Sequence, residues 1–162
     1  SVFPQGTLSK QLKKIEEKEY PYELIELDRD QSGIIAKRTT KLPVSTFPVN
    51  KKQQDKTGSI VVWERPIPNP GFGAYYGSID PVSEGKTTTS DSLCSIFVYK
   101  NATEVTRTTA AGDVEQFLEK DKVVAAWCGR FDDINKTHER LELIIEWFNA
   151  WTIVENNISL FI

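Results

Sequence analysis

The sequence predicts an α/β domain in which a mixed sheet carries helices on its faces. Short apolar runs separated by turn residues indicate strands, and residues 136–150 indicate an amphipathic helix. The apolar positions of this helix follow the i, i+3, i+4, i+7 spacing: Leu141, Ile144, Ile145 and Phe148. The helix joins two apolar runs, and a helical crossover of this length suits a connection between parallel strands. We therefore expect a mixed sheet with flanking helices.

The composition is that of an ordinary globular protein. The chain has 162 residues, of which 39% are hydrophobic and 27% charged, which is enough to bury a core without disulfides. It contains no apolar run long enough to cross a membrane and no signal-peptide pattern. Because the sequence contains no Met, we expect it to be a processed product or an excised piece of a longer protein.

A Pro-rich run at residues 65–71 marks the expected boundary between a connector and hairpin region, residues 1–66, and a core, residues 67–162. The predicted elements of the first region are a helix at 8–18 with the apolar stripe Leu8, Leu12 and Ile15, strands at 22–27, 34–38 and 59–63, and a polar connection at 39–58. In the second region we expect strands at 74–80, 92–99, 122–127 and 151–154, a strand or loop at 101–112, one or two helical turns at 113–120, and a helix at 136–150 capped by Asn135 or Thr137.

Residue usage excludes several kinds of chemistry. The single histidine, His138, rules out a zinc site built from histidines and the usual Ser-His-Asp triad. The two cysteines, Cys94 and Cys128, lie in apolar runs and are expected to be buried thiols. Of the 23 acidic residues, 14 lie in residues 67–162. Any chemistry is therefore expected to come from carboxylates.

Asp80 and Glu155 each lie at the C-terminal end of a strongly apolar strand. If these strands are parallel neighbours, both carboxylates emerge at one sheet edge, where they would repel each other unless a cation lies between them. Mg²⁺ prefers such oxygen ligands, and paired ions can drive phosphodiester hydrolysis. The alternative is structural: Asp80 begins a turn before Pro81, and Glu155 is an exposed strand end.

Two segments, YYGSIDPVSEGKTTTSDSLCSIFVY and VAAWCGRFDDINKTHERLELIIEWFNAWTIVENN, resemble the first half of the RNase H-like nuclease domain of the large terminase subunit of tailed bacteriophages. The family pattern is an apolar strand ending in Asp, a Gly-containing loop, a second Asp, a helix and a strand ending in Glu. Asp80, Gly85, Asp91 and Glu155-Asn156 match it, over roughly residues 59–162.

The resemblance implies a metal-dependent DNA endonuclease that cuts concatemeric DNA during packaging. Asp80 and Glu155 would be metal ligands, with Asp91 as a further catalytic residue and two Mg²⁺ or Mn²⁺ ions in the complete domain. The implied partners are double-stranded DNA, the terminase ATPase domain, the small terminase and the portal protein, in the host cytoplasm at the procapsid. The family's third acidic ligand comes from a later segment, so we expect an RNase H-like sheet truncated before its last carboxylate-bearing element.

Four basic residues are candidate DNA contacts. Arg130 follows a strand in a polar loop, and Lys51, Lys52 and Lys56 lie in the polar connection. Each also has a plainer interpretation: a salt bridge of Arg130 with Asp132 or Asp133, and a solvated loop for the lysines. Two alternatives to the nuclease remain open, a non-catalytic RNase H-like module of the packaging motor and another RNase H-like nuclease of the integrase or resolvase type.

Overall fold

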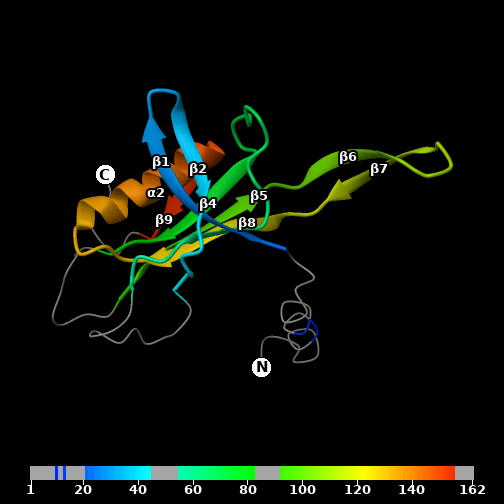
Figure 1. The fold of residues 1–162 in the computed structure, drawn as a ribbon. Coiled ribbons are helices and arrows are strands. Elements are labelled where there is room, and N and C mark those ends of the chain that lie inside the picture. Colours follow the sequence, from blue (N-terminus) through cyan, green and yellow to red (C-terminus); the bar gives the residue numbers. More distant parts are fainter. Residues whose placement is uncertain (1–9, 11–12, 14–20, 45–54, 83–91, 156–162) are drawn as a thin grey trace.

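The computed structural model describes residues 10, 13, 21–44, 55–82 and 92–155 (Figure 1). Seven strands form one sheet in the order β2-β1-β3-β8-β5-β4-β9, and β6 and β7 form a separate hairpin. The elements are β1 (Glu23–Asp30), β2 (Gly33–Arg38), β3 (Ile60–Val62), β4 (Tyr75–Asp80), β5 (Cys94–Lys100), β6 (Thr103–Thr108), β7 (Val114–Glu119), β8 (Lys122–Gly129), α2 (Ile134–Phe148) and β9 (Trp151–Val154).

The sheet is mixed. Strands β4, β5 and β8 form an antiparallel meander, and β3, β1 and β2 extend it in antiparallel fashion. After β8 the chain passes through α2 and returns as β9, which pairs with β4 in parallel. The expected mixed α/β architecture is therefore confirmed, as is the prediction that the strands ending at Asp80 and Glu155 are parallel neighbours.

Helix α2 covers one face of the sheet, and the core lies between them (Figure 1). Three of the predicted apolar positions, Leu141, Ile144 and Phe148, are at most 1% exposed, and Ile145 packs against the core from its margin. The rings of Phe148 and Tyr75 meet edge to face at 5.2 Å, so the end of α2 packs on β4. The helical stripe predicted from sequence is therefore the buried face.

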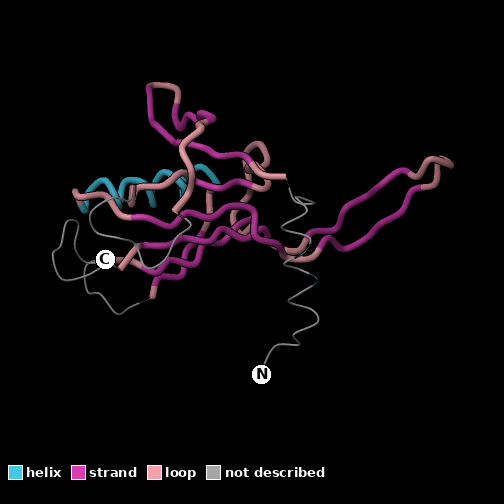
Figure 2. Tube along the Cα trace, turned by 60° about the horizontal axis from the view of Figure 1, so that its bottom comes forward, coloured by secondary structure: helices cyan, strands magenta, loops and turns pink. Residues whose placement is uncertain are grey.

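Two local predictions are wrong. The segment predicted as helical turns at 113–120 is strand β7, paired with β6. The spacing of Val114, Phe117 and Leu118 fits a helix, but pairing with β6 places Phe117 opposite Val105 and under the Arg107 guanidinium, 4.4 Å from the ring centre. Figure 2 shows this hairpin projecting from the sheet.

The start of α2 also differs from the prediction. Asp133 is the N-cap in place of Asn135 or Thr137, and its carboxylate accepts a hydrogen bond of 2.9 Å from the Asn135 backbone N–H. The Thr137 hydroxyl instead accepts from the Phe131 backbone N–H at 3.0 Å. With Asp133 as its cap, the helix begins two residues earlier than predicted, and it also ends two residues earlier, at Phe148.

The expected boundary at residue 66 lies between β3 and β4 in the sequence. Strands from both sides of it belong to the same sheet, because β3 pairs with β8. Several expected features lie outside the described residues: Asp91, Lys51, Lys52 and most of the segment 8–18. Lys10 and Lys13 of that segment are described, and they are helical and exposed. Over the described ranges, no helix is long and apolar enough to span a membrane.

Candidate metal-binding site at the ends of β4 and β9

The parallel ladder of β4 and β9 brings Asp80 and Glu155 side by side. Ile79 is opposite Val154, and the Glu155 backbone N–H continues the ladder by donating to the Ile79 carbonyl at 3.0 Å. The next residue of each strand is therefore the acidic one, and both are exposed. Residues paired in a ladder lie on the same sheet face, so the two carboxylates share one face at one edge.

This face is the one opposite α2. Ile79 is 2% exposed and belongs to the core, and alternation along β4 turns Asp80 the other way. Across the sheet, Asp80 is opposite Ser95 of β5, and Ser95 is opposite Cys128 of β8. A row of four polar residues therefore crosses this end of the sheet: Glu155, Asp80, Ser95 and Cys128. We call it the carboxylate row.

Burial and the negative charge of Asp80 raise the pKa of both thiols of the protein. Burial raises the pKa of Cys128, and the Asp80 carboxylate raises it further. Burial and the same carboxylate raise the pKa of Cys94 to about 12. A thiol near a negative charge is harder to ionise, so this end of the sheet has a negative local field. Such a field attracts a cation and keeps both thiols protonated at neutral pH.

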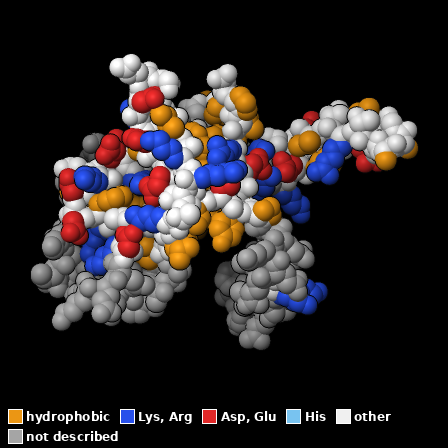
Figure 3. Space-filling view, viewed as in Figure 1, with side chains coloured by type: hydrophobic (Ala, Val, Ile, Leu, Met, Phe, Trp, Pro, Cys, Tyr) orange, Lys and Arg blue, Asp and Glu red, His pale blue; other side chains and the backbone are white. Residues whose placement is uncertain are grey.

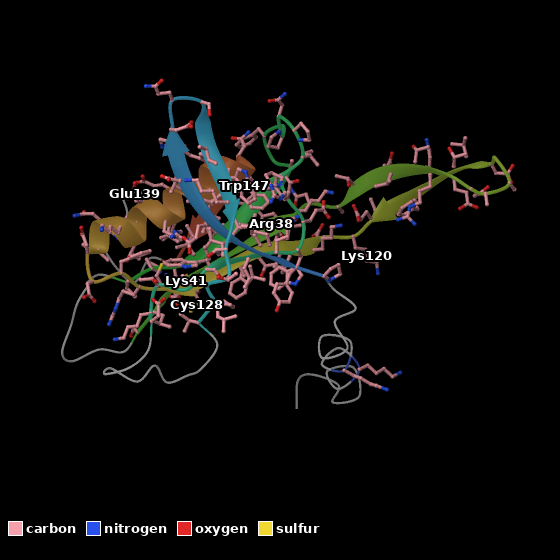
Figure 4. The ribbon with its side chains drawn as sticks, in the orientation of Figure 1. Arg38, Lys41, Lys120, Cys128, Glu139 and Trp147 are labelled. Carbon is pink, nitrogen blue, oxygen red and sulfur yellow. The ribbon has the colours of Figure 1, made fainter. Side chains whose placement is uncertain are left out.

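A loop brings basic residues to the same end of the sheet. The Arg130 backbone N–H donates to the Lys56 carbonyl at 2.7 Å, and the Trp127 indole N–H donates to the Thr57 carbonyl at 2.9 Å. Lys41 joins this loop through an ion pair of 3.2 Å with Asp55. Figure 4 labels Lys41 and Cys128 at the same end of the molecule. A single lysine in a polar connection carries no signal of this placement, and sequence analysis therefore missed Lys41.

The residues expected to contact DNA differ in how exposed they are and in whether they are described. Arg130 is only 4% exposed, and it follows β8 into the contact with the 56–57 loop. The sequence predicted that this guanidinium could reach a phosphate from a polar loop, but a side chain as buried as this one has little access to a DNA backbone. On the face shown in Figure 3, basic and acidic side chains are interspersed rather than gathered by sign. Lys56 belongs to the loop that contacts the end of β8, where Cys128 ends the carboxylate row, and Lys41 is tied to that loop by its ion pair with Asp55.

The donor chemistry of this site suits a hard divalent cation. Asp80 and Glu155 offer carboxylate oxygens from adjacent ladder positions, as Mg²⁺ and Mn²⁺ prefer. Within the described ranges, no group of three or more His, Cys, Asp or Glu side chains is arranged so that it could hold a metal ion. Two carboxylates are a partial set, so a bound cation would need water or other oxygen donors to complete its coordination.

Comparisons with protein-family models, with curated proteins and with solved structures found no match to this chain.

Proposed function

We propose that this chain is the front part of an RNase H-like, metal-dependent DNA endonuclease that acts in phage genome packaging. One observation carries the proposal: Asp80 and Glu155 follow adjacent parallel strands and share one edge of the sheet. The order of meander, helix crossover and parallel strand also agrees with the order that the terminase resemblance implies.

In this proposal Asp80 and Glu155 would hold Mg²⁺ or Mn²⁺, and the substrate would be double-stranded DNA. When bound, paired ions activate a water molecule and stabilise the leaving oxygen. The neighbouring Cys128 stays protonated and neutral, so its thiol does not compete for a hard cation. Lys56 and Lys41, on the loop beside β8, contact the DNA backbone, and Lys51 and Lys52 extend that contact.

The resemblance also implies a third acidic ligand from a segment that follows these residues, with Asp91 close to the site. Two carboxylates hold one ion well, while a second ion would depend mainly on substrate phosphate. An error of about 1 Å in placing a reacting group costs roughly a hundredfold in rate. We therefore propose that the 162-residue chain cuts DNA poorly and that a longer version, extended past Ile162, cuts it efficiently within the terminase.

The test is a time course of supercoiled plasmid nicking with Mn²⁺ or Mg²⁺, with EDTA as the blank. In the extended protein, Asp80→Ala and Glu155→Ala should abolish nicking, while Lys51→Ala should weaken DNA binding and reduce its salt dependence. Glu115→Ala on the β6–β7 hairpin is the matched control and should cut normally. Nicking that survives Asp80→Ala shows that the site is elsewhere. A well-folded extended protein with no activity supports the non-catalytic module instead.

A further inference from the structure

The face that bears the carboxylate row is aromatic at its other end. Tyr76 of β4 stacks on Tyr99 of β5 with ring centres 4.9 Å apart, and on Trp151 of β9 at 5.6 Å. Trp151 is 40% exposed, and Phe97 and Ile153 on the same face are 44% and 57% exposed. Figure 3 shows apolar side chains along the border of the molecule away from α2. We call Tyr76, Tyr99 and Trp151 the aromatic row.

An exposed apolar surface of this kind is expected to be covered by another segment or protein. Large side chains that lie side by side on a sheet face, not scattered singly, mark a site of interaction. The partner has to supply apolar side chains, because the row presents ring faces and edges.

The N-terminal part of the chain enters the sheet at this same end. Glu23, the first residue of β1, is opposite Val62, the last residue of β3. The following Trp63 donates its backbone N–H to Val124 of β8 at 2.8 Å and is 40% exposed. Tyr22, immediately before β1, is 55% exposed. The residues before Tyr22 therefore start beside the open end of this face.

Residues 8–18 have the pattern required of the partner. Leu8, Leu12 and Ile15 form one apolar stripe at helical spacing. The described Lys10 and Lys13 are helical and exposed, as residues off the stripe should be. A helix of this length measures about 16 Å. The aromatic row crosses two strand intervals, from β5 to β9, which is about 10 Å, so the segment is long enough to cover it.

Charge also favours this pairing. Residues 8–18 contain four lysines and two glutamates. Burial and the charge of Asp121 raise the pKa of Tyr76, which places an acidic group beside the aromatic row. The lysines that flank the stripe would therefore meet a negative neighbour.

We propose that residues 8–18 pack as an amphipathic helix on the aromatic row, with Leu8, Leu12 and Ile15 against Tyr76, Tyr99 and Trp151. The segment then covers the apolar end of the sheet face and leaves the carboxylate row open. This intramolecular contact does not depend on the proposed nuclease function.

Acrylamide quenching of tryptophan fluorescence tests the contact, because Trp63 and Trp151 lie at the covered end. Trp127 is buried in the core, and the half-buried Trp147 lies on α2 at the other face of the sheet, so neither should respond. Leu12→Gln with Ile15→Gln should raise the quenching constant. Lys10→Gln with Glu17→Gln changes the opposite side of the same helix, keeps the net charge and should leave quenching at the wild-type level. Circular dichroism in the far ultraviolet checks that both variants keep the folded sheet.

Size-exclusion chromatography with light scattering completes the experiment by measuring the molar mass, and hence the oligomeric state, of the protein over a range of concentrations. We expect a monomer in which the apolar variant alone exposes tryptophan. Equal quenching in the apolar variant and in wild type overturns the proposal. A dimer whose dissociation on dilution raises quenching also overturns it, because a second copy would then be the partner.

Discussion

Gly129 lies where the chain leaves β8, and the structure leaves no room for a side chain there. A Cβ added at this position would lie 2.7 Å from the Lys56 carbonyl oxygen, 2.8 Å from that of Thr57 and 2.8 Å from the Trp127 ring. Two of these contacts are backbone atoms, so Gly129→Ala must push the 56–57 loop away from the strand.

The cost follows from what that loop provides. Overpacking in a tight interior costs roughly 1–3 kcal/mol. Displacing the loop also stretches the hydrogen bonds from the Arg130 N–H and the Trp127 indole to the loop carbonyls, each contributing about 1 kcal/mol. We expect Gly129→Ala to lower the free energy of unfolding by about 3 kcal/mol. In a chain of this size, that lowers Tm by roughly 6–12 °C.

Urea denaturation followed by tryptophan fluorescence measures the effect. Gly71→Ala is the matched control, because no atom lies within 4 Å of its added Cβ and its backbone is not left-handed. It should unfold within about 0.5 kcal/mol of wild type. If Gly129→Ala is as stable as this control, the loop does not pack on β8 as described, and the placement of Lys41 and Lys56 near the carboxylate row fails with it.

Three further predictions concern charge, thiol reactivity and the helix cap. Hydrogen bonds from Arg65, and to a lesser extent from Arg38, lower the pKa of Glu23 from 4.5 to about 2. The ionised Glu23 therefore stabilises the folded protein fully above pH 4.5, and this stabilisation is lost as the pH falls toward 2. The shift corresponds to about 3 kcal/mol. However, the Glu23 side chain is 31% exposed, so we expect a loss of about 1 kcal/mol in acid titrations of wild type that Glu23→Gln does not show. A Cys94 pKa of about 12 against an ordinary 9 leaves about a thousandfold less thiolate, so iodoacetamide should label Cys94 only after unfolding; labelling in the folded protein would contradict its burial. Asp133→Ala removes the N-cap of α2 and should cost about 1 kcal/mol in urea denaturation, whereas an unchanged midpoint would mean that another group caps the helix.

The pairing of the two carboxylate-bearing strands could be predicted because several local signals agreed. Each strand is a short apolar run that ends in an acidic residue, and the helix between β8 and β9 has a clear apolar stripe. A helical crossover returns the chain in the parallel direction, so β9 runs beside β4 with Glu155 next to Asp80.

Other features depend on contacts that a sequence pattern does not reveal. Among the described residues, the β6–β7 hairpin packs against no other layer, so its strands lack the alternation of buried and exposed residues that would distinguish them from helical turns. The position of loop 56–57 depends on its close approach to Gly129. A single glycine at the end of a strand gives no indication of which segment will pack against it. Arg130 follows a strand in a polar sequence, which indicates exposure, but the packing of this loop buries it.

Asp80 and Glu155 are proposed to hold a divalent cation together, and Mn²⁺ binding measured by calorimetry tests this most directly. The 162-residue chain should bind Mn²⁺ weakly, because two carboxylates form a partial ligand set. Asp80→Asn and Glu155→Gln should each weaken binding by roughly tenfold or more. Glu115→Gln on the projecting hairpin should bind as wild type does. Equal affinity in wild type and Asp80→Asn would contradict the account, because the cation would then be held elsewhere.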